Sequence, residues 1–207
     1  MKASVVRIFC KCRNGVHGFG AVCATAIFRS HPRRWAKVAS AGKPIWDQRN
    51  KILASFVPPG SSVVDLGCGA KTLQTHLPPS SSYQPCDLVQ SSREVIVCDF
   101  NAGKYPRLPR RYSHVVCSGV FEYIREPKDF LKRVATYGDN LLLSYNPLRH
   151  GGSRIKRMTN NWCNHFTKPE IESLFAETCL AVELLNESEA GELIYRLKTS
   201  NVVENNF

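Results

Sequence analysis

The stretch Val63-Val64-Asp65-Leu66-Gly67-Cys68-Gly69-Ala70 decides the fold of this chain. An apolar run ends in an acidic residue, two glycines follow at alternate positions, and Lys71 to Leu77 is then predicted to form a short helix. This order of strand, tight turn and helix is typical of the first βα unit of a nucleotide-binding α/β sheet. The glycines allow a sharp turn, which presents backbone N–H groups and the positive end of a helix to a ligand.

Two other nucleotide-binding motifs share part of this pattern. A phosphate-binding P-loop requires glycines where Asp65 and Ala70 stand, so that motif is rejected. The dinucleotide fingerprint fits at Gly67 and Gly69, but Thr72 replaces its third glycine. An NAD(P)-dependent oxidoreductase therefore stays open as an alternative that the sequence does not favour.

Three apolar runs in series end in aspartate. Asp65 ends the first, Asp87 lies 22 positions later at the end of residues 82–86, and Asp99 follows residues 95–98. In a parallel sheet these strand ends share one edge, and an acid at the second strand end lies near ribose hydroxyls. A single aspartate of this kind is usually a turn or cap residue, but three in series favour a cofactor site.

At this point the sequence resembles the Rossmann-like S-adenosylmethionine-dependent methyltransferases. The motifs are Val63 to Gly69, Asp87, Cys98-Asp99-Phe100, and Ser113 to Ile124, and the resemblance extends over Trp46 to Lys198. One departure is Ala70, where many members of the family have a third glycine. The resemblance implies an α/β fold, with a Rossmann-like, doubly wound, mostly parallel sheet and a C-terminal antiparallel hairpin.

The resemblance also implies a cofactor, S-adenosylmethionine, and a set of residues that bind it. Asp87 would hold the ribose, and Asp99 with the main chain of Phe100 would hold the adenine edge. The methionine part would meet Asp65, the main chain of Gly67 and Gly69, and the main chain of Ser118. The expected acceptor is a small molecule or a glycan precursor, the latter suggested by a similarity to methyltransferases of bacterial surface-polysaccharide synthesis.

A hydroxyl acceptor requires a group that takes its proton. His165, which precedes a predicted helix, is the first candidate, although a lone histidine is more often structural. Glu122, Tyr123 and His150 are further candidates, and Glu122 is expected rather to position the cofactor or a loop. A non-catalytic domain that binds an adenosine cofactor or a partner remains an alternative, because binding residues do not prove turnover.

The charge is unevenly distributed along the 207 residues. The formal net charge is +11, yet residues 1–43 contain nine Lys/Arg and no acid, and the remainder carries 19 Lys/Arg against 17 Asp/Glu. The basic excess therefore belongs to an N-terminal extension, residues 1–43, and not to the predicted methyltransferase domain, residues 44–200, or the polar tail, residues 201–207. Nucleic acid is accordingly not expected as the substrate.

Three interpretations of the extension stay open. The first is a targeting leader. The second is a basic arm that lies over the active site or on an anionic membrane surface. The third is a segment without a role. Gly18 to Phe28 is too short to span a bilayer, so no transmembrane segment is expected. The nine cysteines form no CxxC pair, which argues against zinc, and their odd number and the predicted burial of four favour a reducing, cytoplasmic compartment. The oligomeric state is not predicted.

The remaining elements follow from periodicity and caps. A loop is expected between Asp87 and Val95, because seven residues are too few for a crossover helix, and a long substrate loop is expected over residues 148–164. Thr167 and Glu170 predict a capping box. The expected helices are Arg33–Val38, Pro44–Phe56 and Pro127–Val134, and the expected later strands are Val115–Ser118, Asn140–Tyr145, Ala181–Leu185 and Leu193–Leu197.

Overall fold

A computed structural model of the chain describes residues 20–39, 44–178 and 180–199. Predictions that concern residues 1–19, the polar tail and Cys179 lie outside these ranges. The helices of the described part are α2 (Pro32–Ala39), α3 (Pro44–Ser55), α4 (Pro127–Val134), α5 (Arg154–Met158) and α6 (Lys168–Glu177), with 3₁₀ turns η1 (Thr72–His76), η2 (Phe100–Ala102), η3 (Phe121–Tyr123) and η4 (Ala135–Tyr137). The strands are β1 (Ser62–Leu66), β2 (Ser82–Asp87), β3 (Ile96–Val97), β4 (Tyr112–Cys117), β5 (Gly138–Tyr145), β6 (Leu180–Glu187) and β7 (Leu193–Thr199).

The seven strands form one sheet in the order β3-β2-β1-β4-β5-β7-β6. The pairs from β3 to β5 are parallel, and β7 lies antiparallel between β5 and β6. The chain order reverses direction at β1 and β4, which puts a switch point beside the glycine turn. The predicted mostly parallel sheet with a C-terminal antiparallel hairpin is therefore confirmed.

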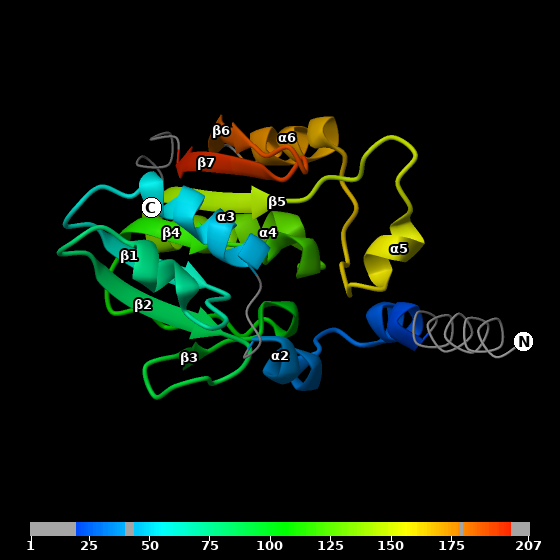
Figure 1. Ribbon diagram of the computed structural model, residues 1–207, viewed down its shortest axis with the longest axis horizontal. Coiled ribbons are helices and arrows are strands. Elements are labelled where there is room, and N and C mark those ends of the chain that lie inside the picture. Colours follow the sequence, from blue (N-terminus) through cyan, green and yellow to red (C-terminus); the bar gives the residue numbers. More distant parts are fainter. Residues whose placement is uncertain (1–19, 40–43, 179, 200–207) are drawn as a thin grey trace, which may run out of the picture.

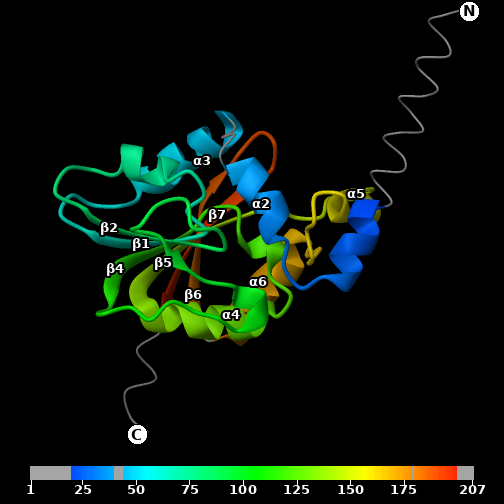
Figure 2. The same cartoon turned by 90° about the horizontal axis from the view of Figure 1, so that it is seen from below.

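Helices cover both faces of the sheet (Figures 1 and 2). Alternate residues of the buried strands face opposite sides, so Val63 packs with α3 and η1 while Val64 packs with α4 and α6. Neighbours on β5 divide in the same way, since Leu142 joins the first cluster and Leu143 the second. This alternation explains why the central strands are apolar throughout.

Most predicted elements are present, with ends that differ by a few residues. The loop after Asp87 contains no helix, and Thr167 and Glu170 form the predicted capping box. The helix predicted over residues 71–77 is a single 3₁₀ segment, η1, rather than an α-helix. Helix α5 was not predicted, because its five residues are mostly basic, but the Ser153 hydroxyl caps it by accepting from the Lys156 N–H.

The N-terminal segment, residues 20–37, does not lie apart from the sheet. Residues 20–27 are helical and lie beside α5, and α2 follows near the carboxyl ends of the parallel strands (Figures 1 and 2). None of the described helices has the length and apolar character needed to cross a membrane.

Candidate functional site

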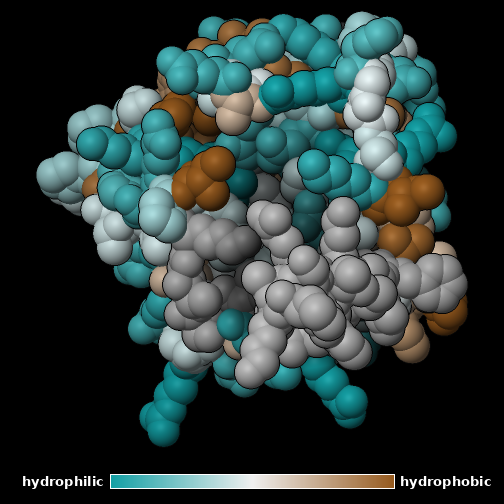
Figure 3. All heavy atoms as spheres, turned by 45° about the vertical axis from the view of Figure 1, so that its right-hand side comes forward, coloured by the Kyte–Doolittle hydropathy of each residue, from teal (hydrophilic) through white to brown (hydrophobic). Residues whose placement is uncertain are grey.

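A cavity of about 840 Å³ opens at the carboxyl ends of the parallel strands. Its wall comes from four parts of the chain: the N-terminal segment, helix α3, the loops after β1 to β5, and the turn between β6 and β7. Figure 3 shows this side of the molecule hollowed, with mainly hydrophilic side chains around the upper part of the hollow. The volume is that of a pocket for one or two small molecules.

The glycine turn forms the part of the wall next to β1. The Gly67 N–H donates to the Cys86 carbonyl at 2.7 Å, and its φ of 87° lies in the left-handed region. A Cβ at Gly67 would overlap the side chain of Val120. Gly69 has φ 52° and nothing within 4 Å of the position of a Cβ, so its backbone borders open space. The turn thus needs glycine at both positions. At Gly67 a side chain would clash with Val120, and at Gly69 the missing side chain lets a ligand approach the backbone.

Asp65 is buried beneath this turn. The Tyr83 hydroxyl donates to Asp65 Oδ2 at 2.6 Å, whereas Oδ1 has no partner among the described residues. Burial raises the pKa of Asp65 to about 7, the nearby Asp87 charge adds to the rise, and the Tyr83 hydrogen bond opposes it. A buried carboxyl with an unpaired oxygen at a cavity wall has the features of a ligand contact.

The two other strand-end aspartates border the same cavity. Asp87 accepts the Gly69 N–H at 2.8 Å on Oδ2 and the Val89 N–H at 3.0 Å on Oδ1, so it fixes the glycine turn. Asp99 accepts the Ser30 hydroxyl at 2.5 Å and the Ala102 N–H at 3.2 Å, both on Oδ1. The tertiary structure therefore brings all three aspartates to one cavity.

Ser118 and Gly119 border the cavity at the end of β4. The Ser118 hydroxyl accepts from Arg49 Nε at 2.8 Å and donates to Asn50 Oδ1 at 2.5 Å. Arg49 also donates to Glu192 at 2.9 Å, and both side chains of this ion pair are 11% exposed. Sequence analysis did not assign Arg49 to the site, although a charged residue among the apolar residues of its helix was a signal for such a role.

The N-terminal segment covers the side of the cavity near β3 and β4. Arg29 and Asn101 exchange hydrogen bonds, in which Arg29 Nη1 donates to the Asn101 carbonyl and Asn101 Nδ2 donates to the Arg29 carbonyl. The Arg125 guanidinium donates to the carbonyls of Thr25 and Phe28. Trp35 packs edge-on against Tyr123, with ring centroids 4.9 Å apart. Apart from Tyr123, sequence analysis did not assign these residues to the site, because each contact joins distant parts of the chain.

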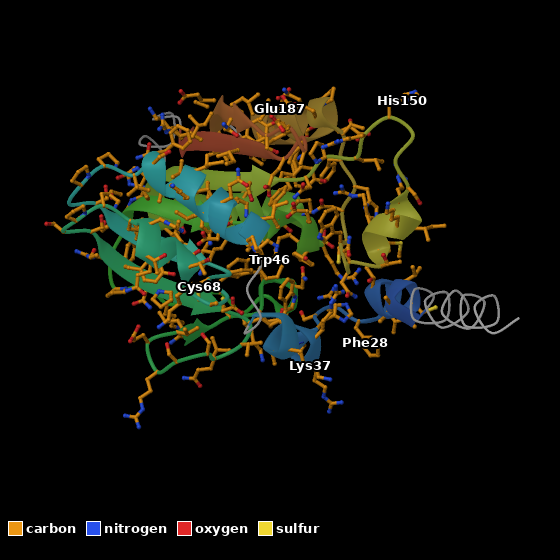
Figure 4. All side chains as sticks on the ribbon, viewed as in Figure 1. Phe28, Lys37, Trp46, Cys68, His150 and Glu187 are labelled. Atoms are coloured by element: carbon orange, nitrogen blue, oxygen red, sulfur yellow. The ribbon has the colours of Figure 1, made fainter. Side chains whose placement is uncertain are left out.

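Two of the residues predicted to take a proton, His165 and His150, are not among the described residues that line this cavity. The Nδ1 of His165 accepts from Arg157 Nε at 3.3 Å. Burial and the charges of Arg157 and Arg154 lower the pKa of His165. Of the other candidates, Glu122 and Tyr123 line the cavity, whereas His150 lies on the loop before α5, away from Trp46 and Cys68 (Figure 4).

The cysteines of the parallel strands are structural. Cys68, Cys86, Cys98 and Cys117 are free and buried, as the sequence predicted. Burial raises the pKa of Cys86 to about 12, so its thiol stays protonated at neutral pH. Within the described ranges no group of His, Cys, Asp or Glu side chains has the arrangement of a metal site.

The comparisons with known proteins point to one fold. No protein-family model and no curated protein matches the sequence. Among solved structures, an S-adenosylmethionine-dependent methyltransferase from Aquifex aeolicus superimposes with a TM-score of 0.59 at 14% identity, covering 83% of this chain and 100% of that one. A 1,6-didemethyltoxoflavin-N1-methyltransferase from Burkholderia thailandensis, with 1,6-didemethyltoxoflavin and S-adenosylhomocysteine bound, gives 0.53 at 15% identity, covering 83% and 92%.

A third structure shows how much of a longer protein the chain matches. The pyocyanin biosynthetic protein PhzM gives a TM-score of 0.56 at 12% identity over 73% of this chain. This chain spans 54% of the length of PhzM. These likenesses, together with the strand order, establish that the chain has the Rossmann-like fold of the S-adenosylmethionine-dependent methyltransferases.

Proposed function

We propose that this protein transfers a methyl group from S-adenosylmethionine to a small molecule. The observation that carries the proposal is the convergence on one cavity of the Gly67–Gly69 turn and the carboxylates of Asp87 and Asp99. Along the strand order β3-β2-β1, the cavity offers Asp99, Asp87 and the Gly67–Gly69 turn. These would meet the adenine, the ribose and the amino-acid end of the ligand in the same order. The sulfur-cofactor complexes among solved structures of this fold support the same cofactor.

The residues present fit this cofactor by three observations. Gly69 leaves open space in front of its backbone, Asp65 Oδ1 lacks a partner, and the Phe100 N–H donates to no described backbone acceptor. The Asp65 oxygen is the clearest vacancy of the three, because buried polar groups are ordinarily paired and a polar ligand would supply the missing partner. The Gly69 N–H is held by Asp87, so Gly69 contributes room for a ligand.

We assign the contacts from the strand ends outward. Asp87 would hold the ribose hydroxyls, and Asp99 with the Phe100 main chain would hold the adenine edge. Asp65, the Gly67–Gly69 main chain and the Ser118 main chain would hold the methionine part.

Arg49 adds a contact that the sequence did not reveal. Its Nε and Nη1 are engaged by Ser118 and Glu192, but Nη2 makes no hydrogen bond to a described residue. A guanidinium beside the end of β4 is suited to a carboxylate, which it binds through paired N–H donors. We assign Arg49 to the carboxylate of the methionine part.

The cofactor supplies an electrophilic methyl group. The chain contributes orientation, because a bound acceptor has to lie in line with the bond that breaks. Arg29, Ser30, His31 and Trp35 border one side of the cavity, where they would limit the access of water to a bound ligand. The acceptor is a small molecule, as for the toxoflavin precursor enzyme of the same fold, and a glycan precursor is the narrower alternative that the sequence suggested.

Calorimetric titration of the full chain with S-adenosylmethionine and S-adenosylhomocysteine, with NAD and NADP in parallel, tests the proposal. We expect saturable binding of the two sulfur compounds alone. Binding of a nicotinamide cofactor instead would assign the protein to the oxidoreductases. If none of the four binds, the methyltransferase assignment fails and a non-catalytic role takes its place.

A further inference from the structure

Glu122 borders the cavity and carries a buried carboxyl oxygen that has no hydrogen-bond partner among the described residues. Its side chain is 1% exposed. Oε1 accepts from the N–H and the Nδ2 of Asn146, at 2.8 and 3.1 Å, whereas Oε2 has no partner among the described residues. A purely structural carboxylate at this depth would have both oxygens paired, because leaving one unpaired costs about 1–3 kcal/mol.

The position of this carboxyl is rigidly fixed. The Glu122 carbonyl accepts the Cys163 N–H at 2.7 Å, so the residue is held by its main chain as well as by Asn146. Asn146 Nδ2 also donates to Glu192 at 3.2 Å, and Glu192 is paired with Arg49. Oε2 is thus a buried carboxyl oxygen of this network without a partner among the described residues, and such preorganised groups are typical of reacting sites.

Glu122 lies near the residues assigned to the methionine part of the cofactor. Ser118 follows β4 directly, and Glu122 lies four residues later in η3. Arg49 donates to Ser118 and to Glu192, and Glu192 also accepts from the Asn146 side chain that binds Glu122. With the methionine part held by Ser118 and Arg49, the methyl group would lie close to this network.

Flat aromatic side chains stand next to Glu122 in the cavity wall. Tyr123 follows it in sequence and packs edge-on against Trp35 at an interplanar angle of 83°. Trp162 precedes Cys163, which binds the Glu122 carbonyl, and it also lines the cavity. The Arg157 guanidinium lies over the Trp162 ring, 4.4 Å from its centroid, and fixes that ring. Such walls favour a planar ring that offers few hydrogen bonds.

We propose that the acceptor is a flat aromatic molecule with a hydroxyl group, that it lies against Trp35, Tyr123 and Trp162, and that Glu122 Oε2 receives the hydroxyl proton. This inference rests on the proposed function. The acceptor O–H bond breaks and its proton bonds to Oε2. The electron pair left on the acceptor oxygen forms the new bond to the methyl carbon. The pair of the former carbon–sulfur bond stays on sulfur. After release of the product the proton leaves Glu122 for water.

The surroundings of Glu122 suit a base. Burial raises its pKa above the ordinary value, which makes the carboxylate a stronger proton acceptor, while main-chain bonding, the Arg49 charge and Asn146 oppose the rise. The titratable and charged groups that face it are Arg49 from α3, Tyr145 from β5, Arg157 from α5, and Tyr123 and Glu192 beside it.

The test uses the full chain saturated with S-adenosylhomocysteine and 2-naphthol as the probe. Excited 2-naphthol is a strong acid, and its emission shifts when a base takes the proton. We expect saturable binding and naphtholate emission from the bound probe, excited at wavelengths where tryptophan does not absorb. Glu122→Gln should bind 2-naphthol within a few-fold of wild type and show the emission of neutral naphthol. Glu189→Gln, a carboxylate change on the exposed rim of the same cavity, should keep naphtholate emission.

Two further measurements test the proton transfer and the aromatic wall separately. In the wild type, naphtholate emission should be lost on acidification, with a midpoint above that of an ordinary glutamate, so the result does not depend on the folding of the variant. Trp35→Leu should weaken naphthol binding by about tenfold, the worth of one aromatic contact.

Three outcomes would overturn the inference. The first is unchanged naphtholate emission in Glu122→Gln. The second is no saturable binding of 2-naphthol to protein that binds S-adenosylhomocysteine. The third is binding of a sugar, methyl α-L-fucoside, in place of 2-naphthol, which would favour the glycan acceptor. Absence of S-adenosylhomocysteine binding is a separate result, which removes the proposed function itself.

Discussion

The Ser30 hydroxyl donates to Asp99 Oδ1 at 2.5 Å, so the N-terminal segment holds the carboxylate that follows β3. This bond joins residues 69 positions apart, and both described hydrogen bonds of the Asp99 side chain fall on Oδ1. Together with the Arg29–Asn101 pair it makes residues 29–31 part of the site wall. The described residues 29–31 of the extension thus border the proposed cofactor site, and the role of the extension stays a prediction.

Arg125 is one anchor of this segment, because its guanidinium donates to the carbonyls of Thr25 and Phe28. Replacing Arg125 by Ala should release the segment and expose the basic residues that follow it. We expect tryptic cleavage at Arg29 and Arg33 to become faster, measured by mass spectrometry under native conditions. Arg111→Ala removes an equally well-bonded arginine elsewhere and should leave this cleavage rate unchanged. Equal rates in the two variants would show that Arg125 does not hold the segment.

The two glycines of the first turn should respond differently to alanine. Gly67→Ala forces a Cβ against Val120 at φ 87°, so we expect the free energy of unfolding to fall by about 1–3 kcal/mol. Gly69→Ala meets open space and should cost less, but it should weaken S-adenosylhomocysteine binding. Urea denaturation and calorimetry separate the two effects. Equal losses of stability would contradict the proposal that Gly69 serves the approach of the ligand rather than packing.

Asp87 combines a structural and a proposed binding role. Asp87→Asn should weaken binding of S-adenosylhomocysteine by about 10- to 100-fold, since a lost charged hydrogen bond costs about 1–3 kcal/mol. The same loss should appear for 5′-methylthioadenosine, which keeps the ribose. Asp139→Asn, an exposed aspartate, is the control for the change in charge. Wild-type affinity in a folded Asp87→Asn protein would remove Asp87 from the site.

Arg49 should distinguish these two ligands. If its guanidinium binds the carboxylate of the methionine part, Arg49→Gln weakens S-adenosylhomocysteine but leaves 5′-methylthioadenosine, which has no carboxylate, within a few-fold of wild type. The expected loss is about tenfold or more, as for other hydrogen bonds to charged groups. Parallel loss of both ligands would mean that Arg49 acts only through the packing of α3 and Glu192.

The pKa of Asp65 predicts a pH dependence of stability. The folded-state pKa of about 7 lies above the ordinary value of 3.8, so the native protein holds this proton more tightly than the unfolded chain. The stabilisation is complete below about pH 4 and is lost as the pH rises to about 7, by on the order of 4 kcal/mol in total. The difference in unfolding free energy between wild type and Asp65→Asn should therefore decrease over this range. A flat difference would mean that Asp65 titrates normally, and Asp139→Asn should show no such decrease.

The sequence by itself determined the architecture. Hydrophobic runs of strand length, the Gly67–Gly69 turn and the strand-end aspartates are local signals, because each depends on neighbours along the chain. The same holds for the capping box at Thr167 and for the loop after Asp87, whose length excludes a helix. Parallel strands necessarily bring their carboxyl ends to one edge, so the meeting of Asp65, Asp87 and Asp99 was predictable without coordinates.

The tertiary structure decided which side chains complete the site. Arg49 reaches Glu192 across 143 positions, and Ser30 reaches Asp99 across 69, distances along the chain that no local pattern encodes. His165 was the first candidate base by residue type; it contacts Arg157 and is absent from the described cavity wall, whereas Glu122 lines the cavity and has a buried oxygen without a described partner. The physical reason is that burial and hydrogen-bond pairing are properties of the packed chain, and these properties determine which ionisable group remains free to react.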